Sequence, residues 1–375
     1  MSDVQPRPGA AARITVRVTM LIGVTVALAS CGVGQPTAVG RTPGTVPAAR
    51  STTTLKPSRT TTTRPSGTPT PGGQQTGTAG APLPTPASLA PFSAPAAAGE
   101  GAWSPAGRMV GGVPAVYETT LVPPGGSEPA GVAWMDTRLL SARLYSGSKS
   151  PGGGPYRYTA PIQPAEAASV VAAFNGGFVM NVAGGGYYTE GSMIDPLVSG
   201  AASLVIYSDG SVNVGAWGSD VAMTPSVVSV RQNLVPLVAA GQPTPQAASP
   251  NWQAWGDTCG ATSCSAAVPG IEQQWRSGVG VTADGALVFA TGPTLDPLQL
   301  AQLLVHAGVE RGMQLDINPN WTVLVTYDPP IPGGLAAPAN GSQLLAATVQ
   351  GPGTFFEPSW ARDFITMSAR PAPPG

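Results

Sequence analysis

The sequence predicts an α+β fold, in which mixed or antiparallel twisted β-sheets with few helices form one globular domain over residues 101–375. Most apolar segments in this range are short, rich in Val, Ile and Thr, and closed by Gly, Asp or Pro, which is typical of strands. Two pairs of these segments are joined by an Asp-Gly turn. Few helices among many hairpins favour the α+β class.

The two expected hairpins are antiparallel, because a short Asp-Gly turn returns the chain alongside itself. The first hairpin has strands at 202–207 and 211–217, joined by the turn Asp209-Gly210. The second has strands at 278–282 and 286–290, joined by the turn Asp284-Gly285.

Two helices are expected. The longer covers residues 296–307, with Asp296 as its N-cap, Pro297 at its first helical position and Gly308 as its stop. A shorter helix over residues 164–172 leads into a strand.

The first thirty residues read as an export signal. An apolar stretch over residues 18–29 follows three arginines and is too short to span a membrane stably. The end of this stretch and the residues after it, Leu28-Ala29-Ser30-Cys31-Gly32, resemble the bacterial lipobox, in which the signal is cut before the cysteine and the cysteine is lipidated. We therefore expect a lipid anchor on Cys31 and an extracytoplasmic location at the cell membrane. The alternative is an ordinary cleaved signal with a chance cysteine.

Residues 31–100 are rich in Pro, Thr, Gly and Ala, and Phe92 is their sole aromatic residue. Such a segment buries too little apolar surface to offset its ordering entropy, so we expect a disordered linker that separates the domain from the membrane.

Charge and histidine content exclude several functions. The chain has 18 Lys and Arg against 19 Asp and Glu, which gives no basic face for nucleic acid. With one histidine, His306, a zinc site built on several histidines is excluded, and His306 itself is expected to be a packing residue. No cofactor or metal is expected, although Ca²⁺ would need only oxygen ligands of the kind that Asp and Asn supply.

The three cysteines divide between two expected roles. Cys31 would carry lipid, while Cys259 and Cys264, five residues apart in an exported chain, are expected to form a small disulfide.

Four stretches, taken in order, resemble the phosphodiester glycosidase family. They are residues 172–178 with the ending Asn175-Gly176-Gly177-Phe178, residues 230–238, residues 276–285, and the 296–307 helix followed by Met313 to Asp316. Arg362-Asp363-Phe364 resembles the last strand of the family. The resemblance implies hydrolysis of the glycosidic bond to phosphate in a sugar 1-phosphodiester or a related cell-envelope glycan.

Two carboxyl groups are candidates for the catalysis that the resemblance implies. Asp316 ends an expected strand and could stabilise an oxocarbenium-like transition state or activate water. Its alternative role is to cap the turn at Asn318-Pro319. Glu190, in a glycine-rich loop, is the candidate partner acid, and the alternative is a solvated side chain.

Phosphate recognition would need arginine, whose paired donors fit phosphate oxygens. Arg276 is the first candidate and Arg231 the second, with a surface ion pair as the alternative. Asn175, Gly176 and Gly177 would bring an amide and bare backbone N–H groups to the substrate.

One departure from the family concerns the residues after Asp316. Many members have two glycines there, whereas this chain has Ile317-Asn318-Pro319-Asn320-Trp321. Because proline lacks an N–H, a glycine-type anion nest cannot form unchanged. Asn318 and Trp321 are expected to rebuild the pocket for another sugar. The alternative is a non-catalytic lipoprotein of the same fold that binds a glycan or a protein.

Overall fold

The computed structural model of the chain describes residues 80–249, 255–256 and 273–371. All of them belong to one of two compact units of the chain, Ser66–Gly375. None of the helices in these ranges is long and apolar enough to cross a membrane. Cys31, Cys259 and Cys264 lie outside the described residues, so their expected lipid and disulfide stay predictions.

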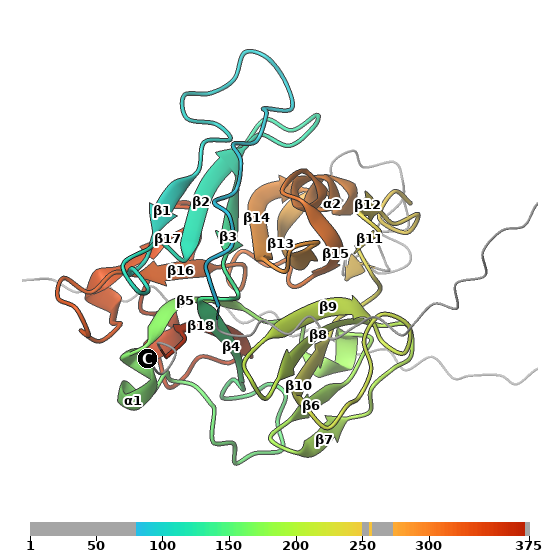
Figure 1. Cartoon of the computed structure of the whole chain (residues 1–375). Coiled ribbons are helices and arrows are strands. Elements are labelled where there is room, and N and C mark those ends of the chain that lie inside the picture. Colours follow the sequence, from blue (N-terminus) through green and yellow to red (C-terminus); the bar gives the residue numbers. More distant parts are fainter. Residues whose placement is uncertain (1–79, 250–254, 257–272, 372–375) are drawn as a thin grey trace, which may run out of the picture. The chain divides into compact units, whose positions relative to one another are not determined.

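The described residues form three β-sheets and two α-helices, and every pairing between the strands is antiparallel (Figure 1). This confirms the predicted α+β class. The first sheet has eight strands, in the spatial order β1 (Ser104–Ala106), β2 (Val116–Leu121), β3 (Ala130–Met135), β14 (Leu287–Leu295), β13 (Gln274–Thr282), β15 (Val309–Gln314), β11 (Val238–Ala239) and β12 (Gln242–Pro243).

The other two sheets have five strands each. One has the order β7 (Ser192–Asp195), β6 (Tyr187–Thr189), β10 (Val227–Gln232), β8 (Ala202–Tyr207) and β9 (Val212–Ala216). The other has the order β17 (Gly341–Gln343), β16 (Leu324–Tyr327), β5 (Val170–Asn175), β18 (Phe364–Ala369) and β4 (Leu140–Tyr145). Short 3₁₀ helices cover Met180–Val182, Pro338–Asn340 and Thr354–Phe356.

Both predicted hairpins are present. The first is β8–β9, where Gly210 has a φ of 77°, a conformation that glycine adopts without strain. The second is β13–β14, whose strands extend beyond the predicted ranges to nine residues each.

The longer predicted helix is α2 (Pro297–His306). The Asp296 side chain accepts a hydrogen bond from Gln299 N, and the Gln299 side chain binds Asp296 N in return, which completes a capping box. Gly308 follows with a φ of 88°. Figure 1 shows α2 lying over β13, β14 and β15. The shorter helix, α1 (Pro164–Ala167), ends earlier than predicted.

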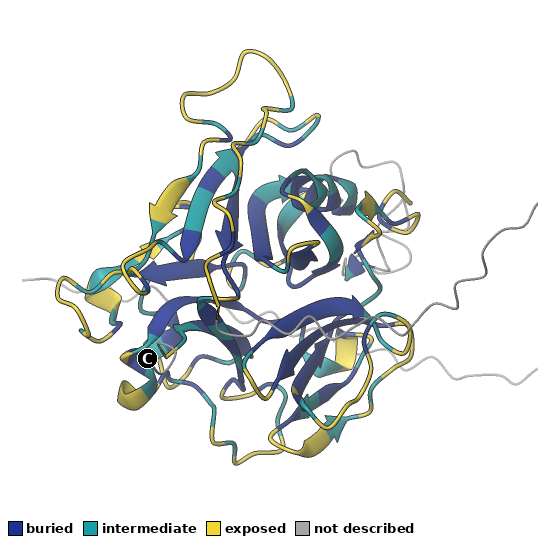
Figure 2. Ribbon diagram, viewed as in Figure 1, coloured by how far each residue is buried: buried dark blue, intermediate teal, exposed yellow. Residues whose placement is uncertain are grey.

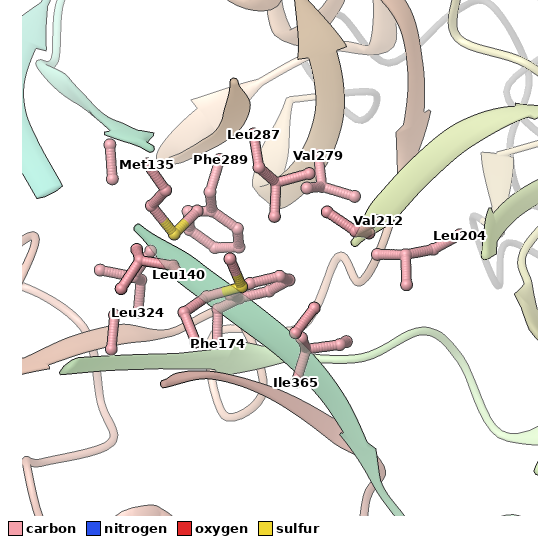
Figure 3. Packing of buried hydrophobic residues seen from close by; sticks show 14 of the residues in the cluster. Met135, Leu140, Phe174, Leu204, Val212, Val279, Leu287, Phe289, Leu324 and Ile365 are labelled. Atoms are coloured by element: carbon pink, nitrogen blue, oxygen red, sulfur yellow. The ribbon is translucent and has the colours of Figure 1, made fainter. Parts of the chain in front are cut away.

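A central hydrophobic core lies where the three sheets face one another. Figure 3 shows Met135 and Phe289 from the first sheet, Phe174 from the sheet of β5, and Leu204 from the sheet of β8, all pointing into this core. A second cluster packs α2 against the other face of the first sheet. As Figure 2 shows, the central strands are buried, whereas the exposed residues are concentrated in the connections and in short edge strands such as β1 and β7.

Residues 80–100, which the sequence assigns to the linker, pack against the domain. Leu83 is buried, and its N–H donates to Asp136 Oδ2 at 2.7 Å. The Phe92 ring lies 4.4 Å from His306, whose Nε2 is 2.7 Å from Ala90 O. The boundary of the domain therefore precedes residue 101, because a few apolar side chains in a proline-rich segment fit grooves on the folded surface.

A chain that starts at Ser104 should be less stable than one that starts at Gly80. Burying one Leu or Phe side chain contributes about 1.5–3 kcal/mol, so the loss should be at least about 2 kcal/mol. Chemical denaturation of both chains measures the difference in their free energies of unfolding. In the longer chain, Phe92→Ala should show part of this loss, and the control Ser93→Ala, at an exposed position, should show none. Equal midpoints for the two chains would contradict this role of residues 80–103.

Candidate functional site

Three segments far apart in the sequence meet where β5 ends. The Asn175 side chain, at the end of β5, donates to Ser277 Oγ in β13 at 3.0 Å and accepts from Val323 N at 3.1 Å. Ser277 Oγ accepts from Asp316 N at 3.2 Å, and Ser277 N donates to Asp316 O at 2.8 Å. The structure therefore brings together Asn175 and Asp316, and Ser277 joins them.

The two carboxylate oxygens of Asp316 have different surroundings. Oδ1 accepts hydrogen bonds from Ile317 N at 2.8 Å and Asn318 N at 3.0 Å, which is the predicted Asx-type turn. Oδ2 is buried and has no hydrogen-bond partner among the described residues. Its ion-pair contact is with Arg362 Nη2, at 3.7 Å. One oxygen therefore fixes the turn, and the other is held unbonded beside a guanidinium.

Burial raises the pKa of Asp316 from its usual value of 3.8 to about 6. The positive charge of Arg362 and the N–H groups of Asn318 and Ile317 act in the opposite direction, and the nearby Asp363 adds slightly to the rise. A carboxyl group with a pKa near 6 can exchange a proton close to neutral pH.

Two tryptophans flank Arg362. Its guanidinium lies 4.9 Å from the centre of the Trp321 ring, and the Trp321 and Trp360 rings meet edge to face at 5.0 Å. Arg362 Nη1 and Trp360 Nε1 are buried and, like Asp316 Oδ2, lack a hydrogen-bond partner among the described residues. Folded proteins pair nearly all buried polar groups, so three such atoms in one cluster point to a bound molecule or water.

A cavity of about 400 Å³ opens beside these tryptophans. Besides Trp321 and Trp360 it is lined by Gln350, Thr354 and Glu357. Aromatic rings combined with a few polar side chains are typical of small-molecule sites. We call Asn175, Ser277, Asp316, Trp321, Trp360 and Arg362 the Asp316 cluster.

The glycines of the Asn175-Gly176-Gly177 turn are required by close packing. A Cβ atom on Gly176 would lie 2.0 Å from Asp363 Oδ2, and one on Gly177 would lie 2.7 Å from Asn233 Oδ1. Gly176 N donates to Asp363 O at 2.9 Å. Both glycines are buried, and the N–H of Gly176 is already hydrogen-bonded to Asp363. The glycines therefore allow close packing next to the cluster, and they do not form the exposed set of N–H groups for an anion that the sequence predicts.

Arg231 does not serve as the predicted phosphate ligand. It is fully buried, and its guanidinium pairs with Asp363 through Nε at 2.8 Å and Nη2 at 3.2 Å. Further donors bind Gln232 O and Phe178 O. The side chain therefore holds the turn after β5 to the start of β18.

Arg276 is also fully buried and faces away from the Asp316 cluster. Neighbouring residues of a strand point to opposite faces of the sheet. Ser277 points to Asn175 and Asp316, whereas Arg276 donates to Leu295 O at 2.7 Å and to Gln314 Oε1 at 2.9 Å. The guanidinium beside Asp316 is instead that of Arg362.

Glu190 does not join the Asp316 cluster. It lies in the turn between β6 and β7 with a φ of 52°, and its carboxylate accepts from Arg157 N and Tyr158 N, both at 2.9 Å. It lines a different cavity. Asn318 is exposed beside the cluster, and its side chain accepts from Asn320 N at 2.9 Å.

Ser277, Trp360, Arg362 and Asp363 were not predicted as site residues from the sequence. The signal for two of them was the Arg362-Asp363-Phe364 stretch, since a charged pair directly before a buried strand is a candidate for a site at the strand's end. Within the described ranges, no group of three His, Cys, Asp or Glu side chains could hold a metal ion.

Comparison with known proteins gives structural matches alone. No family model matches the chain, and no curated protein matches it. The catalytic domain of zebrafish N-acetylglucosamine-1-phosphodiester alpha-N-acetylglucosaminidase, auto-inhibited by its pro-peptide, overlays with a TM-score of 0.43 and 16% identity, covering 72% of this chain and 88% of that one. A hypothetical protein from Synechocystis overlays with a TM-score of 0.36 and 11% identity, covering 71% of this chain and 64% of that one. TM-scores below 0.5 are too low to carry an argument about function.

Proposed function

We propose that the chain is a lipid-anchored, extracytoplasmic hydrolase that cleaves the bond between a sugar and phosphate in a sugar 1-phosphodiester or a related cell-envelope glycan. The observation that carries the proposal is the Asp316 carboxyl, buried, with a raised pKa and one unbonded oxygen beside Arg362. The motifs that resemble phosphodiester glycosidases support the same chemistry, and the lipobox-like Cys31 supports the location.

Each member of the cluster has a role in this reaction. The ionised Asp316 would stabilise positive charge at the anomeric carbon or activate a water molecule there. Arg362 would neutralise the leaving phosphate, which needs charge compensation more than a proton. The rings of Trp321 and Trp360 would pack against the sugar.

Arg362 also controls access to Asp316. Asp316 Oδ2 is buried and lies 3.7 Å from Arg362 Nη2, so we expect the guanidinium to move before a substrate reaches the oxygen. A phosphate diester offers the stronger, bidentate partner and would draw Arg362 away from Asp316. A neutral glycoside lacks this group, which favours phosphodiesters as substrates.

The experiment is an assay of sugar release by the full chain from a panel of glycosyl phosphodiesters. Turnover of at least one, lost in Asp316→Asn, supports the proposal. Saturable binding without any product supports the non-catalytic alternative, in which Pro319 marks a pocket that has lost activity. Absence of both binding and turnover contradicts both functions.

The pH profile gives a second prediction. If the ionised carboxylate acts, kcat/KM should fall as the pH drops below about 6, because the proton then occupies Asp316. In Arg362→Lys, which keeps the charge, this limb should stay near the same pH. In Arg362→Ala, which removes a charge that lowers the pKa, the limb should move to higher pH. A profile that is flat through this range would contradict the role of Asp316.

A further inference from the structure

A second cavity, of about 390 Å³, lies between the sheet of β8 and the sheet of β4. It shares no lining residue with the Asp316 cluster or with the cavity beside Trp321. Four charged side chains line it, namely Arg143 in β4, Glu190 after β6, Asp209 after β8 and Arg370 after β18. The lining also includes six residues with hydroxyl groups, namely Ser141, Tyr158, Thr189, Tyr207, Ser208 and Ser229.

The two arginines are held in place before any ligand binds. The Arg143 guanidinium contacts Glu166 Oε2 at 2.6 Å and lies 4.1 Å from the centre of the Tyr158 ring. Arg370 Nε donates to Thr137 O at 3.1 Å and to Leu140 O at 2.9 Å. Fixed donors lose little conformational freedom on binding, as a preorganised site requires.

The two acids are fixed as well. Glu190 adopts a left-handed backbone conformation that is unfavourable for a residue other than glycine, and its carboxylate binds the N–H groups of Arg157 and Tyr158. It thereby holds in place the loop that carries Tyr158 into the cavity wall. Asp209 Oδ1 accepts from Ser211 N at 2.8 Å, which leaves Oδ2 as an acceptor.

The left-handed backbone of Glu190 follows from the tight turn between β6 and β7, because Glu190 and Gly191, with φ of 52° and 79°, are the two loop residues of this hairpin. One feature of the cavity is not explained by the fold alone. Arg370 Nη2 is buried and has no hydrogen-bond partner among the described residues, although the other donors of this guanidinium are occupied. Arg370 lines the cavity, so its guanidinium is a candidate donor to a ligand there.

We propose that this cavity binds a neutral saccharide. The lining has two arginines and two acids, and Arg143 is already paired with Glu166, so the cavity has no excess of positive charge and a phosphate or carboxylate ligand would meet repulsion from Glu190 and Asp209. Each sugar hydroxyl both donates and accepts, and therefore uses guanidinium, hydroxyl and carboxylate partners together. The volume is within the range of small-molecule pockets. The site is separate from the proposed catalysis and would retain the protein on a glycan chain.

The test is a titration of the full chain with glucose, mannose, galactose and N-acetylglucosamine, with inorganic phosphate as the anionic comparison, followed by ligand-observed NMR. At least one sugar should bind. Arg143→Ala removes a donor, and Val228→Trp fills the opening from an exposed position on β10, so each should weaken binding at least about tenfold.

The controls separate this site from the proposed active site. Lys149→Ala removes one exposed positive charge outside the cavity and should bind as the unaltered chain does. Asp316→Asn should also keep sugar binding, whatever its effect on turnover. Absence of binding by every sugar, binding that both cavity variants leave unchanged, or binding of phosphate in preference to sugars would overturn the proposal.

Discussion

Replacing Asp316 with asparagine should abolish turnover of glycosyl phosphodiesters. Asparagine keeps the size of the side chain and an oxygen that can accept from Ile317 N and Asn318 N, so the turn should survive. It cannot ionise, and the charge that would stabilise the transition state is lost. Positioned acids and bases contribute roughly 10²–10⁴-fold to a rate, so kcat should fall by at least about a hundredfold while KM changes little.

The same substitution should stabilise the fold at neutral pH. The pKa of Asp316 is raised from 3.8 to about 6, so between these values the folded chain binds more protons than the unfolded chain. Stability from this group is therefore greatest at low pH and falls as the pH rises to about 6, by about 3 kcal/mol in full. Asparagine avoids this cost.

The measurement is urea unfolding of both proteins at pH values below and above this range. We expect Asp316→Asn to gain stability over the unaltered chain above pH 6 and to gain little near pH 4. The exposed Asp328→Asn serves as the control and should show no such dependence. A loss of stability at neutral pH would mean that Asp316 is a structural ion-pair partner of Arg362, and the proposed function would lose its main support. Residues of active sites often reduce the stability of the folded protein, because activity needs groups that the fold alone would not favour.

Local features of the fold could be predicted from the sequence because their causes are local. The Asp-Gly hairpin and α2 with its capping box depend on residues within about four positions of one another. The linker boundary was misplaced because Leu83 and Phe92 are isolated apolar residues, and partners that hold this segment are far away in the sequence: Asp136 lies 53 residues from Leu83, and His306 lies 216 residues from Ala90.

The positions of two candidate residues follow from the sequence for a similar reason. Asn175 ends the buried strand β5 and Asp316 follows β15 by two residues, and their roles in a site stay predictions. Arg276 was misassigned because the sequence alone does not show which face of its strand points to the site. The face is decided by the pairing of the strand in the sheet, and a shift of one residue moves every side chain to the opposite face. Arg231 was misassigned because its partner, Asp363, lies 132 residues away in the sequence.

Replacing Asp363 with asparagine should have the largest effect on stability. Asp363 and Arg231 form a fully buried ion pair, and removing one partner leaves an uncompensated charge in the interior. Such losses cost about 3–5 kcal/mol, a large part of the total stability of a typical domain. Asp363 also accepts from Gly176 N through its backbone and precedes β18 directly after Arg362, so the geometry of the Asp316 cluster should be lost together with the fold.

A double-mutant cycle separates the pair from the fold around it. Arg231→Met removes the charge that Asp363→Asn leaves unpaired, so the two changes together should be less damaging than the sum of their separate effects, because buried pairs replaced by apolar groups are often tolerated. The exposed pair Arg143–Glu166 is the comparison, since its side chains are 41% and 27% exposed and Glu166→Gln should cost at most about 1 kcal/mol. If Asp363→Asn costs no more than Glu166→Gln, the buried pair does not hold the turn after β5, and the position of the Asp316 cluster must depend on the hydrogen bonds of Asn175 and Ser277 alone.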